Sequence, residues 1–110
     1  MALYNYQELQ EKVLNSNNKN IYKIICSNIK KLRKERYNEF KSVFQSNSIN
    51  PYTTENIAAL LDYNHNHYKR FESDNDPTKR IPLNKLILLT IILDTTLDEI
   101  IKDKSKNDSY

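Results

Sequence analysis

Apolar residues recur every three or four positions through most of this 110-residue chain, and no other feature constrains its fold as strongly. One such series consists of Ile21, Ile25, Ile29 and Leu32. Residues at this spacing form a stripe along one side of an α-helix, and the stripe has to be buried. No segment alternates apolar and polar residues as a half-buried strand does. The sequence therefore predicts an all-α protein.

The chain divides into an N-terminal segment, a main domain and a tail. Residues 2–14 place apolar side chains along one stripe and predict a short amphipathic helix, and the polar run NSNNKN then favours turns. We interpret residues 1–20 as this helix and its linker, and residues 21–101 as the domain. Residues 102–110 have no apolar periodicity and are expected to form a flexible, solvated tail.

The first helix of the domain is amphipathic and basic. Its polar side carries Lys30, Lys31, Arg33, Lys34 and Arg36. The helical rhythm continues from Tyr37 to about residue 46, and Pro51 then disfavours helical geometry at the preceding residue. Either one long helix or two consecutive helices end there. The basic side is a solvated surface or, in part, a surface that contacts phosphate groups.

Two short helices joined by a tight turn are expected next. Thr53 or Thr54 can cap the first, because a threonine hydroxyl accepts hydrogen bonds from the N–H groups of the first helical turn. An interruption of two residues then precedes Asn64, which is a second capping residue. Tyr68 and Phe71 are three residues apart and are expected to face the core.

The C-terminal part of the domain is strongly apolar. Residues 83–93 are apolar nearly all round, so a helix there must be covered on several sides. The stretch TTLDEII predicts a last helical turn, capped by Thr95 or Thr96, with Leu97, Ile100 and Ile101 facing inward.

Composition excludes some classes of function. The formal net charge of +3 permits an anionic partner without requiring one, and the absence of glycine disfavours glycine-rich nucleotide-binding loops. The single cysteine, Cys26, cannot form an internal disulfide and is expected to be a buried or half-buried structural residue. Neither a leader segment nor a run of about 18 apolar residues is present, so we expect a cytoplasmic protein that does not enter membranes.

Four stretches carry a family resemblance: NIKKLRKER (28–36), YTTENIAALLD (52–62), YNHNHYKRFES (63–73) and IPLNKLILLTIILDTTLDEII (81–101). Their order and pattern resemble the phage-repressor (Cro) and xenobiotic-response-element family of helix-turn-helix DNA-binding proteins. Residues 52–72 fit the family's motif without a gap, and Ala58 lies where the family has a small residue at the helix crossing. The resemblance implies a small helical bundle of the lambda-repressor-like type.

The chain departs from the family pattern at three places. Asp62 occupies a turn position that is usually glycine, and Thr54 occupies a helix start that is usually glutamine. The segment 37–51 replaces the short connection that family members have after the first core helix. We therefore expect an enlarged segment at this point, in addition to the extra N-terminal helix.

The resemblance implies that residues 64–73 are a recognition helix, which in such proteins lies in the DNA major groove. His65, Asn66 and Arg70 then lie at positions that face bases, where Asn pairs with adenine and Arg with guanine. The expected contacts to the DNA backbone are Thr54, Asn64, His67, Lys69, Lys79 and Arg80. The alternative is a solvated helix face in a protein that binds something else.

His65 and His67 also suggest a metal pair, but side chains two positions apart on a helix point in different directions. Zinc needs three or four convergent ligands, and Cys26 lies on another element. No nucleophile–base pair or pair of carboxylates stands out. We expect neither a metal site, a cofactor nor an enzyme.

Two further pairs take their meaning from the resemblance. Arg33 and Glu72 lie where family members have a structural salt bridge between the first helix and the recognition helix. Leu88 and Ile91 lie where the family commonly has outward-facing polar residues, so something is expected to cover them. The candidates are the N-terminal helix, the segment 37–46 and a second subunit.

These observations predict a sequence-specific transcriptional regulator that binds double-stranded DNA, most simply as a homodimeric repressor. The alternative is a helix-turn-helix scaffold used as a protein-interaction module: an antitoxin, an antagonist of another regulator or a phage-encoded inhibitor. Such a module would have a protein partner. The fold alone does not separate the two functions.

Overall fold

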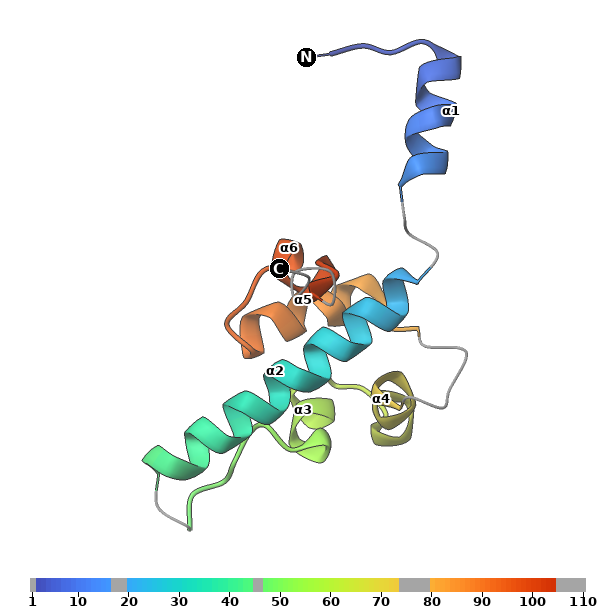
Figure 1. Ribbon diagram of the computed structural model, residues 1–110. Helices are drawn as coiled ribbons and strands as arrows, with labels where there is room; N and C mark the ends of the chain where they lie inside the picture. Colours follow the sequence, from blue (N-terminus) through green and yellow to red (C-terminus); the bar gives the residue numbers. More distant parts are fainter. Residues whose placement is uncertain (1, 17–19, 45–46, 74–79, 105–110) are drawn as a thin grey trace.

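The structure is a computed structural model that describes residues 2–16, 20–44, 47–73 and 80–104 (Figure 1). Within these ranges it contains helices and no strands, which confirms the all-α prediction. The six helices are α1 (Tyr6–Asn15), α2 (Ile21–Val43), α3 (Thr54–Leu60), α4 (His65–Glu72), α5 (Leu83–Ile92) and α6 (Leu97–Ile101). None of the helices in these ranges is long and apolar enough to cross a membrane.

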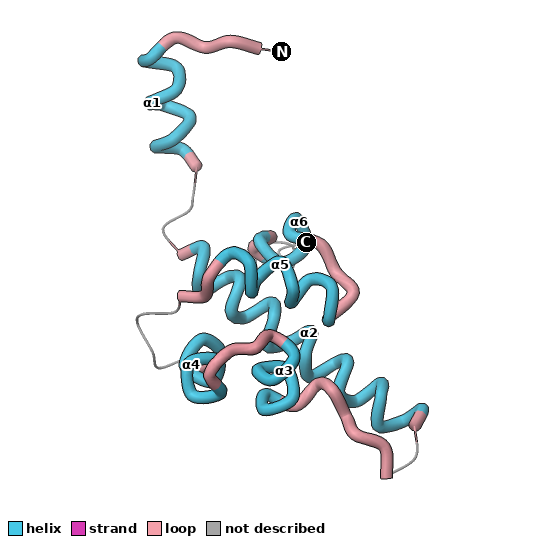
Figure 2. The backbone as a smooth tube through the Cα atoms, turned by 180° about the vertical axis from the view of Figure 1, so that it is seen from behind, coloured by secondary structure: helices cyan, strands magenta, loops and turns pink. Residues whose placement is uncertain are grey.

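Helix α2 runs through the centre of the domain. Helices α3 and α4 lie on one side of it, and α5 and α6 lie on the other (Figures 1 and 2). The core forms where these helices meet, and its largest fully buried side chains are Tyr68, Phe71, Ile29, Ile57, Leu61, Leu89, Leu93 and Ile100. Tyr68, Phe71 and the small Ala58 are thus buried as predicted.

The 23 residues of α2 form one continuous helix, about 35 Å long, so the segment 37–51 begins as an extension of α2. This settles the choice that the sequence left open between one helix and two. The rings of Phe40 and Phe44 stack at 4.2 Å in the extension, and the edge of Tyr52 packs near Phe40 at 6.3 Å. Aromatic contacts therefore hold the returning chain against the end of α2.

Side-chain caps define where the short helices begin. The side-chain oxygens of Thr53, Asn64 and Thr96 accept hydrogen bonds from backbone N–H groups three residues further on, at 3.1, 3.1 and 3.2 Å. The predicted cap at Asn64 is confirmed, and the threonine alternatives resolve to Thr53 and Thr96. Asp62 has a φ of 51°, the left-handed conformation expected at this turn, and Asp94 has the same conformation after α5.

Some expectations for the C-terminal helices are wrong. Leu97 and Ile101 of α6 were expected to face inward but are exposed, because α6 has only five residues and buries only Ile100. Leu88 and Ile91 of α5 are 39% and 70% exposed. Neither α1 nor the extension of α2 covers them, so two of the three expected coverings are absent from a single chain.

Helix α1 stands apart from the rest of the molecule (Figure 1). It begins at Tyr6 rather than near residue 2, because the side chain of Asn5 caps it by accepting a hydrogen bond from the Glu8 N–H at 2.8 Å. None of its ten residues is buried. Of the expected tail, only residues 102–104 are among those described.

Candidate nucleic-acid interface

Helix α4 has a buried side and an exposed polar side. Tyr68, Phe71 and Glu72 are its buried residues. Asn66, Lys69 and Arg70 are exposed, and since Lys69 and Arg70 lie three and four positions after Asn66, both side chains are neighbours of Asn66 on the helix surface. An amide, an ammonium and a guanidinium group therefore form one contiguous surface. The predicted base-contact residues Asn66 and Arg70 are both on it.

His65 lies at the edge of this surface and has a contact within the chain. Its Nε2 atom is 3.1 Å from the hydroxyl oxygen of Thr54, the first residue of α3. The pair connects the start of α3 to the start of α4, and both residues are half-buried. Of the residues proposed from sequence, Thr54 and His65 are thus brought together, although the sequence assigned them to backbone and base contacts respectively.

His67 and Asn64 lie at the N-terminal end of the exposed side. The His67 ring is 5.9 Å from the ring of Tyr63, and its backbone N–H donates to the side-chain oxygen of Asn64. The cap uses the oxygen of the Asn64 side-chain amide and not its NH₂ group. Both residues are exposed, as contacts to a DNA backbone require.

A buried ion pair fixes α4 against α2. Arg33 donates from Nε and Nη2 to the two carboxylate oxygens of Glu72, at 2.7 and 2.9 Å, and from Nη1 to the carbonyl oxygen of Tyr52 at 3.1 Å. The salt bridge predicted from the sequence is confirmed. Its planar, two-bond geometry sets the orientation of α4, which is the helix with the polar surface.

The hydroxyl of Tyr68 completes this network by donating to a Glu72 carboxylate oxygen at 2.5 Å. Burial of the ring, together with the charge of Glu72, raises the pKa of Tyr68 above its ordinary range, so the hydroxyl keeps its proton and remains a donor. Burial alone would lower the pKa of Arg33, but the hydrogen bond and charge of Glu72 raise it. The hydroxyl of Tyr68 therefore remains a donor, and the guanidinium of Arg33 keeps its charge.

The same ion pair determines the charge of the exposed side of α4. Glu72 is the one carboxylate in this helix, and it is 4% exposed and paired with Arg33. It therefore contributes little negative potential outside the protein. Lys69 and Arg70 give the exposed side of the helix a positive charge that no acidic residue of α4 offsets.

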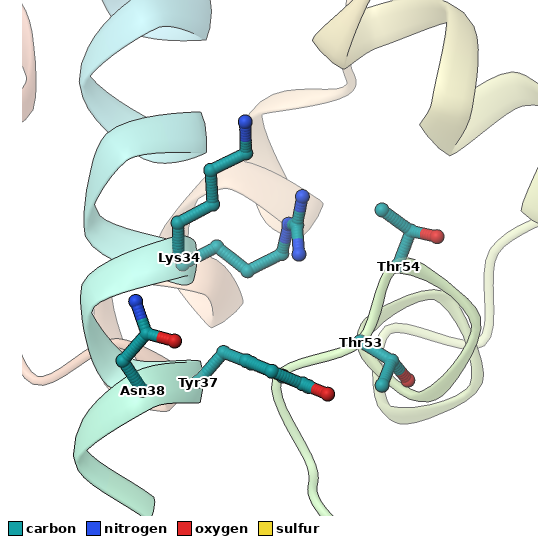
Figure 3. A pocket seen from close by; sticks show the side chains of 6 residues that line it. Lys34, Tyr37, Asn38, Thr53 and Thr54 are labelled. Carbon is teal, nitrogen blue, oxygen red and sulfur yellow. The ribbon is translucent and has the colours of Figure 1, made fainter. Parts of the chain in front are cut away.

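A hollow of about 470 Å³ adjoins this surface, between α2 and the start of α3. It is lined by Arg33, Lys34, Tyr37, Asn38, Thr53 and Thr54. Figure 3 shows Lys34, Tyr37 and Asn38 projecting from α2 on one side, with Thr53 and Thr54 on the other. Because Thr54 contacts His65, polar side chains continue from this hollow to α4.

Sequence reasoning gave Tyr37 and Asn38 no role. The available signal was the spacing: Lys34 and Asn38 are four residues apart and share a face only if the helix continues through the enlarged segment. That continuation was left open, so the wall of the hollow was not foreseen.

The basic run of α2 separates into structural and exposed members. Besides Arg33, Arg36 is structural: it donates to the carbonyl oxygen of Leu93 at 3.0 Å and pairs with Glu39 at 3.2 Å. Lys34 is exposed at the rim of the hollow. Arg80, expected at the DNA backbone, is also exposed, whereas Lys79 lies outside the described residues.

No group of three metal-ligating side chains lies together in the part of the chain that the structure describes. The two histidines have separate surroundings, at Thr54 and at Tyr63. Cys26 is buried, and its thiol donates to the carbonyl oxygen of Phe71 at 2.7 Å, which is the structural role expected for it.

Comparison with known proteins adds no assignment to this geometry. Neither a protein-family model, a curated protein nor a solved structure matches the chain. The evidence for function is therefore the chemistry of the chain itself, above all the exposed polar side of α4 and the buried ion pair that positions it.

Proposed function

We propose that this protein is a sequence-specific DNA-binding transcriptional regulator, in which α3 and α4 act as a helix-turn-helix unit and α4 enters the major groove. The observation that carries the proposal is the exposed side of α4, where Lys69 and Arg70 adjoin Asn66 and the carboxylate of this helix, Glu72, is buried and paired with Arg33. The family resemblance of residues 28–101 supports the same assignment.

Asn66 and Arg70 are assigned to the bases. An asparagine amide pairs in a bidentate way with adenine, and an arginine guanidinium does so with guanine, each in the major groove. His65 lies at the edge of the same surface and reaches a base only if its contact with Thr54 opens. The bidentate pairs are the source of sequence preference, so we assign most of the specificity to Asn66 and Arg70.

The DNA backbone is assigned to the residues around that surface. Three of these residues flank the proposed base contacts on α4, namely Asn64, His67 and Lys69. A fourth, Arg80, lies beyond α4 in the sequence. The hollow beside Thr54 offers hydroxyl groups and the ammonium of Lys34, which suit one phosphate group. Contacts of this kind position the protein and make its affinity depend on salt.

The proposal is tested by selecting binders from a random pool of DNA duplexes at low salt and then titrating salt against the selected site. A regulator binds the selected site more tightly than bulk DNA, and its affinity falls linearly with salt on a logarithmic plot. If no sequence is bound more tightly than bulk DNA, the proposal is wrong.

A protein-interaction module is the second candidate, and the exposed apolar side of α5 is the observation that favours it. Exposed apolar patches mark protein interfaces. In this case α4 would be a solvated surface, and replacing Asn66 and Arg70 together by alanine would change no activity of the protein. Loss of selected-site binding in this double variant would rule the module out as the only function.

A further inference from the structure

Helix α1 is built like a helix that packs on something. It has a side-chain cap at Asn5, and an apolar series follows its length. This series, the α1 stripe, consists of Tyr6, Leu9, Val13 and Leu14. Val13 and Leu14 are 68% and 82% exposed. Together with Gln10, the stripe borders a hollow of about 400 Å³.

A helix of this length is not stable by itself. Isolated helices shorter than about 12–15 residues are marginal in water, and most helical stability in proteins comes from packing an apolar side. Helix α1 has ten residues and buries none of them. A surface that covers the α1 stripe is therefore needed to keep α1 helical.

The outward side of α5 is a matching surface. The α5 face consists of Leu83, Ile87, Leu88 and Ile91, all exposed, and the polar Asn84 lies among them. Helices α1 and α5 have ten residues each and are both about 15 Å long, so the two surfaces have the same length. Each presents residues three and four positions apart, the spacing that lets ridges on one helix pack into grooves on another.

A single chain leaves both surfaces open. Helix α1 projects away from the domain (Figure 1). The side chains of the α5 face stay exposed. The Cα atoms of Ser16 and Asn20 are four residue steps apart and can be separated by at most about 14 Å, so α1 stays near the start of α2. A second copy of the chain supplies the missing partner for both surfaces at once.

We propose that two copies of this protein exchange their N-terminal helices, so that the α1 stripe of each packs on the α5 face of the other. The proposal goes beyond the proposed function, which requires no second copy. The two contacts are identical and related by a twofold axis, as in most homodimers.

The area to be buried favours this reciprocal arrangement. Full burial of one fully exposed aliphatic side chain removes roughly 60–120 Å² from water. The eight side chains are 39–82% exposed, so one contact between the stripe and the face buries at most on the order of 600 Å². Stable protein interfaces bury about 1,200–2,000 Å² in total. One contact falls well short of this range, and two contacts come to its lower limit.

Disulfide trapping between two differently sized fusions of the full chain tests the exchange. One fusion carries Leu9→Cys and the other carries Ile87→Cys. When they are mixed and oxidised, the expected main product joins the two sizes. The wild-type chain, whose Cys26 is buried, is the blank, and Glu11→Cys on the polar side of α1 is the matched control.

Two results would overturn the exchange. A chain with both cysteines that closes its own disulfide at nanomolar concentration and stays monomeric would show that α1 folds back on its own α5. Absence of any Leu9–Ile87 product would show that another partner covers these surfaces.

A second measurement does not depend on cysteine chemistry. Val13→Glu is exposed on α1 and should halve the sedimenting mass while lowering the helical circular dichroism only by the share of α1, whereas Glu11→Gln should leave both unchanged. A Val13→Glu protein that stays dimeric would contradict the exchange. A trapped dimer without DNA preference would refute only the proposed function, and a DNA-binding monomer would refute only the exchange.

Discussion

Helices α4 and α5 differ most on the sides that the core does not use. Each buries one side, through Tyr68 and Phe71 in α4 and through Leu86 and Leu89 in α5. Their outward sides are opposite in character, polar and positive in α4 and apolar in α5. Because folding leaves outward residues largely unconstrained, their chemistry indicates partners: polar base edges and phosphates for α4, and another apolar surface for α5.

The largest expected effect comes from removing the ion pair that holds α4 in place. Arg33→Met should lower the free energy of unfolding by about 3–5 kcal/mol, because the Glu72 carboxylate stays buried without its partner. Denaturant unfolding at fixed protein concentration measures this loss.

The control for this change is the neighbouring Lys34→Met, which is exposed and should change the free energy by less than about 0.5 kcal/mol. Equal small losses in the two variants would mean that α4 is not held by the pair. Combining Arg33→Met with Glu72→Gln should recover part of the loss, because no charge is then left buried.

The next effect tests the apolar character of α5. The double variant Leu88→Glu with Ile91→Lys places charges on the α5 face and should raise the dimer dissociation constant at least about 100-fold, equivalent to about 2.7 kcal/mol. Sedimentation equilibrium checks this. Both side chains are exposed in the single chain, so the helices of the domain should persist, and only the helical signal of the uncovered α1 should be lost.

Lys41→Glu, at the far end of α2, is the control for charge alone and should leave the dimer intact. A wild-type protein that is already monomeric at high micromolar concentration would show that the α5 face does not bind a second copy of the chain.

The polar side of α4 gives an intermediate effect. Arg70→Ala or Asn66→Ala should weaken binding to the selected DNA site by roughly 1–3 kcal/mol while leaving binding to bulk DNA nearly intact. A lost base contact removes sequence information without removing many counterions. Fluorescence anisotropy with selected and scrambled duplexes measures both affinities. An equal loss on both duplexes would reassign these residues to the DNA backbone.

The smallest effect concerns single phosphate contacts. Lys34→Ala at the hollow, and separately Arg80→Ala, should weaken binding to every sequence alike and reduce the slope of log affinity against log salt by about one. Lys41→Ala, outside the proposed interface, should leave the slope unchanged. An unaltered slope for Lys34→Ala would exclude the hollow from the DNA surface.

Local rules were enough to predict much of the fold. Helical periodicity located the helices and capping chemistry placed the cap at Asn64, because both depend on a few neighbouring residues. The left-handed turn at Asp62 followed instead from the family resemblance. The outward position of Asn66 and Arg70 followed from the inward position of Tyr68 and Phe71, since one periodicity fixes both.

Features that depend on distant contacts were not predicted. Asn50, which follows α2 in the chain, makes hydrogen bonds to α2 and to α3. Its side chain donates to the Tyr37 carbonyl of α2 at 3.2 Å, and its own carbonyl accepts from the Asn56 side chain of α3 at 2.8 Å. These bonds, with the aromatic stack at Phe40, favour the extension of α2 and so create the hollow. No residue spacing in the sequence predicts these hydrogen bonds, because they join segments that are distant along the chain. The contact between Thr54 and His65 was not predicted for the same reason.

The polar bonds made by the middle of α2 determine where this chain can change its length. Asn28 donates to the carbonyl oxygens of Ile100 and Lys102, both at 2.8 Å. Arg33 donates to the Glu72 carboxylate of α4, and Arg36 donates to the Leu93 carbonyl at the end of α5. One residue inserted between Asn28 and Arg36 would rotate one end of this span by about 100° relative to the other and separate these bonds from their partners. Added sequence is therefore tolerated only outside the span, and α1 with its linker and the extension after Arg36 are both attached there.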